Sequence, residues 1–129
     1  MKKRIFVACS DERLRIALLM LLEHEIGMGV VGITDRLSGL VLNLEASQPN
    51  VLLLGWEIPN QELVDLLADI HNLKSPPMII FFSSKPEEEQ EIITAGADYF
   101  ICENAPPDKL LLILRELLGS QWSLEELHD

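Results

Sequence analysis

Five short apolar runs, each followed by a segment with helical spacing, constrain the fold of this chain more than any other feature. The runs are continuous rather than interrupted by polar residues at every second position, and they cover residues 4–9, 30–34, 51–55, 76–82 and 98–102. Strands that are apolar on both faces are typical of a parallel sheet covered by helices on both sides. The pattern therefore predicts an α/β fold with three layers.

The segments between the runs carry the signals that begin and end helices. We expect helices over residues 10–26, 35–47, 60–73, 86–96 and 106–119. Ser10 and Asn60 are expected to cap the first and third of these, because their side chains accept hydrogen bonds from free backbone N–H groups. Proline opens the last two helices and glycine closes them. Strand and helix thus alternate five times, which predicts a single doubly wound (βα)5 domain.

Charge and composition narrow the classes of function. The 129 residues include 21 acidic and 10 basic side chains, so the formal net charge is -11. This balance argues against direct binding of nucleic acid or of an anionic membrane. No apolar run approaches the ~20 residues that cross a bilayer, and the N-terminal apolar run is too short for a signal peptide. With two cysteines and no disulfide framework, we expect a cytoplasmic protein with reduced thiols.

One glycine motif suggests nucleotide chemistry but lacks the right context. "GMGVVG", residues 27–32, matches the letters of the dinucleotide-binding fingerprint. That fingerprint must follow a strand and open a helix, whose N-terminus then meets the pyrophosphate. Here the motif follows a predicted helix and leads into a strand, so we interpret its glycines as turn residues. The histidines show no spacing typical of metal ligands, and we expect no metal site.

The third apolar run ends at a residue without a side chain. "VLLLGWEIPN", residues 51–60, is a buried strand that opens into a loop at Gly55, with Trp56 and Glu57 directly after it. In open α/β sheets, ligands and reacting groups lie at the carboxyl ends of the strands. A position that is expected to carry chemistry therefore carries only a hydrogen atom.

Residues 3–118 resemble the CheY-like receiver domain of two-component response regulators. The most specific segments are "PNVLLLGWEIPNQELVDLL" (49–67) and "AGADYFICENAPPDKLL" (95–111), which are similar to receivers of transcription regulators with a C-terminal helix-turn-helix. The resemblance implies a flavodoxin-like sheet of order 2-1-3-4-5. It also implies a receiver-like domain over residues 1–118 and a polar tail, or the start of a linker, over 119–129. In that order Cys9 and Cys102 lie about 14 Å apart, too far for a disulfide.

The residues that carry the family's chemistry are replaced in this chain. In receivers, an acidic pair after the first strand and an aspartate ending the third strand hold Mg²⁺, and that aspartate accepts the phosphoryl group. A Ser or Thr ending the fourth strand and a Lys ending the fifth contact the phosphate. The acidic pair falls on Cys9 and Ser10, the acceptor on Gly55, the hydroxyl on Phe82 or Ser83, and the lysine on Glu103. The resemblance thus predicts a pseudo-receiver with no catalytic residue, phosphoacceptor, metal or cofactor.

Two alternatives to this interpretation stay open. A conventional phosphorelay receiver would need a relocated acceptor, Asp11 or Glu57, together with a rebuilt site for the metal. A small-ligand sensor would use the vacated cleft. We further predict that the ring of Trp56, or a phenyl ring of Phe81 or Phe82, fills that cleft, because a void costs about 1 kcal/mol per methyl-sized group. Trp56 as a partly exposed loop residue is the competing interpretation.

The leading interpretation is a non-enzymatic regulatory module of a two-component-type, transcriptional regulator. It would act through contact with a partner protein or a second copy of the chain, with no membrane and no direct nucleic-acid contact. DNA binding would come from a C-terminal domain in a longer parent protein. The candidate face lies within residues 86–118, where Tyr99, Leu111 and Leu112 are the candidate contacts. The apolar row 110–113 covers more than one side of a helix, so part of it is surplus to the core.

Overall fold

The computed structural model describes residues 3–25, 27–58 and 60–127, with the side chains of all of these except residue 60 and residues 118–127. Within these residues, one parallel sheet contains β1 (Lys3–Cys9), β2 (Met28–Thr34), β3 (Val51–Gly55), β4 (Met78–Ser83) and β5 (Tyr99–Cys102). The strands follow the order β2-β1-β3-β4-β5. The predicted sheet order is therefore confirmed.

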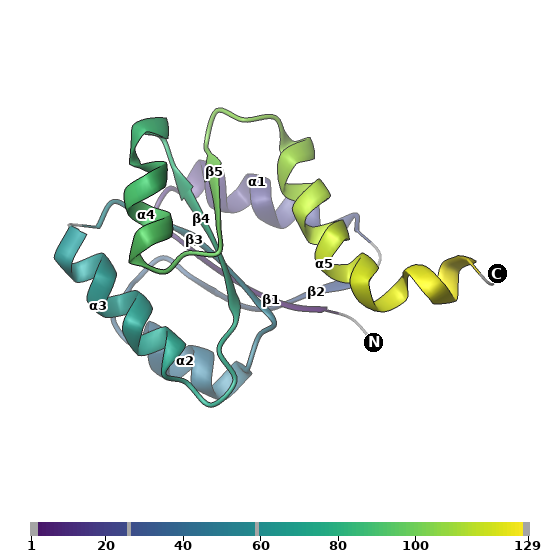
Figure 1. The fold of residues 1–129 in the computed structure, drawn as a ribbon, viewed down its shortest axis with the longest axis horizontal. Coiled ribbons are helices and arrows are strands. Elements are labelled where there is room, and N and C mark those ends of the chain that lie inside the picture. Colours follow the sequence, from purple (N-terminus) through teal and green to yellow (C-terminus); the bar gives the residue numbers. More distant parts are fainter. Residues whose placement is uncertain (1–2, 26, 59, 128–129) are drawn as a thin grey trace.

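Helices cover both faces of the sheet (Figure 1). They are α1 (Glu12–Glu23), α2 (Leu40–Ser47), α3 (Asn60–His71), α4 (Glu89–Ala95), which a 3₁₀ turn at Pro86–Glu88 precedes, and α5 (Pro107–Leu127). Helices α1 and α5 pack on one face, and α2, α3 and α4 pack on the other. This arrangement is the predicted three-layer (βα)5 fold. None of the helices in the described residues has the length and apolar character needed to cross a bilayer.

Along each central strand, alternate side chains pack into two separate core clusters. On β3, Val51 and Leu53 contact the cluster under α1 and α5, whereas Leu52 and Leu54 contact the cluster under α2, α3 and α4. All of these side chains are buried. Since successive side chains of a strand point to opposite faces, a strand buried on both faces must be apolar at every position. This is the physical reason for the continuous apolar runs in the sequence.

Helix α2 begins at Leu40, later than the predicted residue 35. The preceding residues form turns: the Thr34 hydroxyl accepts a hydrogen bond from the Arg36 N–H at 3.1 Å, and the Leu40 N–H donates to the Leu37 carbonyl at 3.0 Å. Gly39 has a φ of 78°, in the left-handed region that does not propagate a helix. Local side-chain to backbone hydrogen bonds thus compete with the first helical turn.

Helix α5 continues past Gly119, where the sequence predicted its end, and runs to Leu127. Glycine in a helix interior costs about 1 kcal/mol relative to alanine, but it ends a helix only when it takes a left-handed conformation. The backbone here stays helical through Gly119. Residues 119–127 therefore extend α5, while residues 128–129 lie outside the described residues. The division into a domain over 1–118 and a tail or linker stays a prediction.

The glycine motif also differs from its interpretation as a turn. Gly27 lies at the turn before β2, with a φ of 90°, but Gly29 and Gly32 are residues of β2 itself. A Cβ on Gly32 would lie 2.2 Å from Cε2 of Phe6 on the neighbouring strand. Glycine is needed there because the Phe6 ring packs directly over the β2 backbone.

Candidate functional site

The carboxyl ends of β1, β3, β4 and β5 bring the predicted site positions together. Cys9 pairs with Gly55 across β1 and β3, and Gly55 pairs with Phe82 across β3 and β4. Glu103 follows β5, and its N–H donates to the carbonyl oxygen of Ser83 at 2.8 Å. A cavity of about 370 Å³, here called the acceptor cavity, lies at this edge, with Ser10, Gly55, Phe82, Ser83 and Glu103 among its lining residues.

Two neighbouring side chains occupy the space beside Gly55. An alanine Cβ at this position would lie 3.1 Å from Cys9 Sγ, 3.1 Å from Leu14 Cδ2 and 3.6 Å from Phe82 Cβ. Cys9 is fully buried, and Leu14 is a half-buried residue in the first turn of α1. Carbon and sulfur atoms prefer separations nearer 3.5–4 Å. Thus the chain lacks the acceptor side chain, and the first atom of such a side chain would press on its neighbours.

Trp56 and Phe82, two of the three rings predicted to fill the cavity, lie in its wall. Trp56 is half-buried and packs against the core cluster under α2, α3 and α4, and it lines the acceptor cavity without closing it. Phe82 forms part of the cavity wall, whereas Phe81 contacts the opposite core cluster. The cavity keeps a volume of about 370 Å³ beside these rings, and the prediction that one of them fills the vacated space stays a prediction. Cys9 and Leu14 occupy the space next to Gly55, a role that the sequence did not reveal.

Asp11 is the N-cap of α1, one residue after the predicted cap. Its Oδ1 accepts hydrogen bonds from the N–H groups of Arg13 at 2.8 Å and Leu14 at 3.4 Å. The backbone N–H of Ser10 instead donates to the Gly55 carbonyl at 3.1 Å, which ties the start of α1 to the end of β3. An aspartate at a helix N-terminus satisfies free N–H groups and meets the positive end of the helix dipole. Capping alone accounts for a carboxylate at this position.

The register of β4 places Phe82 beside Gly55 and Ser83 at the end of the strand. The Ser83 hydroxyl donates to Glu88 Oε1 at 2.8 Å and accepts from the Lys85 N–H at 3.1 Å. Its proton and one of its two lone pairs are therefore engaged in the turn that leads into α4. The residue that pairs with Gly55 is therefore Phe82, which has no hydroxyl.

Carboxylates dominate the electrostatics of the acceptor cavity. Burial raises the pKa of Glu103, and the charges of Asp11 and Glu57 raise it further. Burial also raises the pKa of the Cys9 thiol. Among the described residues that line the cavity, no Lys, Arg or His is present. A cavity with this lining repels phosphate, because like charges disfavour each other in a partly desolvated site.

The residues at this edge do not fit the Mg²⁺ ion that receivers hold. Mg²⁺ requires oxygen ligands in near-octahedral geometry, usually with one or two carboxylates. The three positions that would supply carboxylates carry a buried thiol at Cys9, an exposed hydroxyl at Ser10 and no side chain at Gly55. Nowhere in residues 3–25, 27–58 and 60–127 are three or more His, Cys, Asp or Glu side chains grouped so that they could hold a metal ion.

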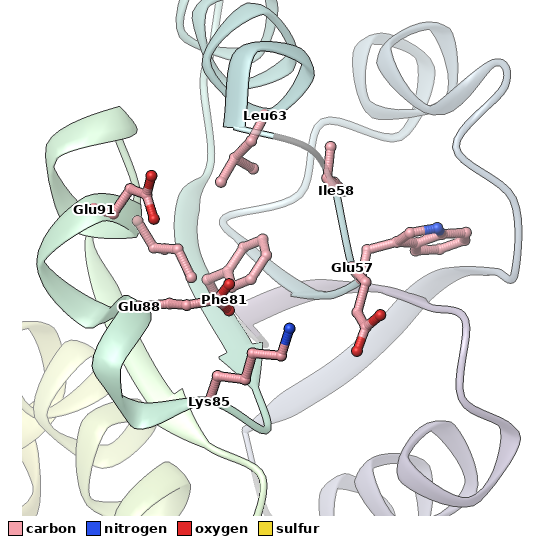
Figure 2. A pocket seen from close by; sticks show the side chains of 9 residues that line it. Glu57, Ile58, Leu63, Phe81, Lys85, Glu88 and Glu91 are labelled. Carbon is pink, nitrogen blue, oxygen red and sulfur yellow. The ribbon is translucent and has the colours of Figure 1, made fainter.

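A second cavity of about 330 Å³ adjoins the first, on the side of α3 and α4. Figure 2 shows the Lys85 ammonium pointing into it between Glu57 and Phe81, with Glu91 approaching from α4. Trp56 and Glu57 line both cavities. Sequence reasoning missed Lys85, because a single lysine in a loop before a proline carries no recognisable spacing.

The candidate contact face contains one clearly exposed leucine. Leu110 and Leu114 lie on the buried side of α5, whereas Leu112 on the same helix is 67% exposed. Leu111 and Tyr99 are half-buried, and Tyr99 packs against the core cluster under α1 and α5. Leu112 is thus the surplus apolar residue that the row 110–113 predicts.

Solved structures similar to this chain are receiver domains of response regulators. No protein-family model and no curated protein sequence matches the chain. The receiver domain of NarL from Mycobacterium tuberculosis superposes with a TM-score of 0.77 at 19% identity, over 90% of this chain and 95% of that one. The isolated receiver domain of RcsB from Salmonella enterica superposes with a TM-score of 0.78 at 17% identity, over 92% and 90%. A CheY-like receiver protein from Methanospirillum hungatei superposes with a TM-score of 0.75 at 26% identity, over 95% and 98%.

Proposed function

Because this chain has the fold of a CheY-like receiver domain, we propose that it is a pseudo-receiver: a signalling module that accepts no phosphoryl group and acts through protein contact. The observation that carries the proposal is the end of β3. Gly55 has no side chain, and the first atom of one would lie 3.1 Å from both Cys9 Sγ and Leu14 Cδ2.

The surroundings of Gly55 support the same conclusion. Phosphoryl transfer needs an oxygen nucleophile, a metal ion and a cation placed on the developing charge. Position 55 offers no nucleophile, and positions 9 and 10 offer no carboxylates for the metal. Glu103, at the position predicted to match the family's lysine, adds negative charge where the phosphate would sit. Each replacement weakens the reaction, and together they remove every part of it.

The output of this module is proposed to be transcriptional. One similar structure is named a DNA-binding response regulator of the LuxR family from Staphylococcus aureus, and it is 18% identical. Another is an RcsB structure from Salmonella typhimurium whose name refers to DNA interaction, and this chain covers 61% of it. With a net charge of -11, this chain is unsuited to contact DNA itself. We propose that a separate domain of the parent protein binds DNA, and a cytoplasmic location stays a prediction.

The proposed contact face is the exposed side of α5 and the adjoining end of β5. Among the described side chains of this face, Leu112 is the most exposed apolar one, and Leu111 and Tyr99 are partly buried. An apolar side chain that the core does not use is a favourable contact for a partner or a second copy. In this proposal the face is available without phosphorylation.

Exposure to small phosphodonors tests the central claim. The chain is incubated with acetyl phosphate and Mg²⁺, and separately with beryllofluoride and Mg²⁺, and followed by intact-mass measurement and amide NMR spectra. The RcsB receiver, solved in the presence of the phosphomimetic BeF₃⁻, serves as the positive control. We expect unchanged mass and unchanged spectra for this chain.

A mass gain of one phosphoryl group would remove the pseudo-receiver proposal and favour a relocated acceptor. The variants Asp11→Asn and Glu57→Gln would then identify the modified carboxylate, because only the true acceptor variant would lose the added mass. Asp11→Asn keeps a side chain that can cap α1, so its loss of mass gain would not reflect unfolding.

A further inference from the structure

An apolar groove runs between α1 and the start of α5 and lies beside the acceptor cavity. Its volume is about 460 Å³, and aliphatic side chains and prolines form much of its wall, including Ala17, Leu21, Pro106 and Leu110. Leu14, Phe82 and Glu103 line both the groove and the acceptor cavity. The two hollows adjoin at these three residues and are here together called the composite cleft. Hollows of 300–1,000 Å³ are the size range of small-molecule sites.

The two ends of the composite cleft differ in chemistry. The groove end presents apolar side chains, with His24 and Cys102 among the few polar ones. The strand end presents the carboxylates of Asp11, Glu57 and Glu103, and the described residues lining that end include no basic side chain. Glu103 lies at the junction, so it faces both an apolar wall and two other carboxylates.

We propose that the composite cleft binds a small amphipathic cation, with an apolar body between α1 and α5 and a protonated amine or guanidinium at the strand end. Charge complementarity decides the head group. An anion would meet several carboxylates, and a neutral head would leave the charge of the half-buried Glu103 unbalanced, while Asp11 and Glu57 are exposed. A cation offsets the mutual repulsion of the carboxylates at the strand end. The apolar body removes water from aliphatic surface, which supplies non-directional affinity.

This inference goes beyond the proposed signalling role and rests on different observations. The phosphodonor experiment examines the chemistry of Gly55, whereas the cation proposal rests on the shape and charge of the composite cleft. A chain that fails to take up a phosphoryl group could bind the cation or not. The two tests therefore succeed or fail separately.

Three probes with one apolar body and different heads test the proposal: phenylbutylamine, phenylbutanol and phenylbutyrate. Binding is followed by amide NMR shifts and by indole fluorescence in a Trp122→Phe background, which leaves Trp56 as the remaining tryptophan of the two in the chain. We expect the amine to bind at least tenfold more tightly than the alcohol, because hydrogen bonds to ionised groups are about twice as strong as neutral ones. The carboxylate probe is expected to show no measurable binding.

Matched variants locate the head and the body. Glu103→Gln is expected to weaken amine binding about tenfold, whereas Glu91→Gln removes the same charge from α4, outside the composite cleft, and should leave binding unchanged. Ala17→Trp places a large side chain at an exposed position of the groove and should weaken amine and alcohol alike. Equal affinity of amine and alcohol, equal loss in both glutamine variants, or no binding of any probe would overturn the proposal.

Discussion

Replacing Gly55 by alanine tests whether the acceptor position is closed by its neighbours. The new Cβ would lie 3.1 Å from both Cys9 Sγ and Leu14 Cδ2. Leu14 Cδ2 is the end of a flexible, half-buried side chain and has room to shift, whereas the Cys9 thiol is fully buried. Gly55 is not among the glycines with positive φ, so its backbone accepts alanine without strain. Any loss of stability therefore reports the crowded space and not the backbone.

The expected loss follows from two opposing effects. Adding a carbon to a packed core typically costs about 1–3 kcal/mol, and the lower half of this range applies because one of the two close neighbours can relax. Against this, exchanging glycine for alanine reduces the entropy of the unfolded chain and stabilises the fold by about 0.4–1 kcal/mol. We expect a net loss of about 0–1.6 kcal/mol in the free energy of unfolding.

A double-mutant cycle with Leu14→Ala isolates this contact. Removing the leucine opens one side of the space, so Gly55→Ala should cost about 1 kcal/mol less in that background than in the wild type. Denaturant unfolding of the wild type, the two single variants and the double variant gives the coupling energy. An alanine at position 55 that stabilises the protein, together with zero coupling to position 14, would show that the space is open and refute the reasoning.

Three further outcomes follow from the structure. Gly32→Ala should destabilise the protein more than Gly55→Ala, by about 2–4 kcal/mol, because its Cβ would overlap the Phe6 ring; thermal melting ranks the two. Asp11→Ala should cost about 0.5–2 kcal/mol and Asp11→Asn much less, measured by urea unfolding. Burial and neighbouring carboxylates raise the pKa of Glu103 in the folded protein. The contribution of Glu103 to the free energy of unfolding is therefore complete below its unfolded-state pKa and is lost as the pH rises through its folded-state pKa. Glu103→Gln should therefore gain stability over the wild type as the pH is raised from about 4 to 8, and an equal difference at both ends of this range would contradict the sign.

The fold was predictable because a strand that is buried on both faces has a continuous run of apolar residues in the sequence. Residues 51–54 are all apolar because each contacts one of the two cores. The predicted bounds of this strand, Val51–Gly55, match the structure. Helix ends were less predictable. The turns before Leu40 depend on hydrogen bonds of Thr34, and the continuation through Gly119 depends on a backbone angle that glycine leaves free.

The candidate site was predictable in position but not in content. The resemblance placed Cys9, Gly55 and Glu103 at neighbouring strand ends, and the sheet register puts Cys9 beside Gly55. The size of the rings predicts Trp56, Phe81 or Phe82 as the side chain that fills the vacated space, whereas the atoms nearest to a Cβ on Gly55 belong to Cys9, Leu14 and Phe82. Which side chain reaches into a space depends on the approach of α1 to the strand ends, and spacing along the chain does not encode that approach.

By itself, the sequence determined the alternation of strands and helices, the sheet's burial on both faces and the absence of a side chain at Gly55, because each is a property of local residue identity. Only the tertiary structure decided that Leu14 crowds the acceptor position and that Glu103 faces Asp11 and Glu57. It also decided that the acceptor cavity lies beside an apolar groove. These features arise where segments far apart in the sequence meet. The distances between their side chains follow from how the helices pack on the sheet rather than from any one segment.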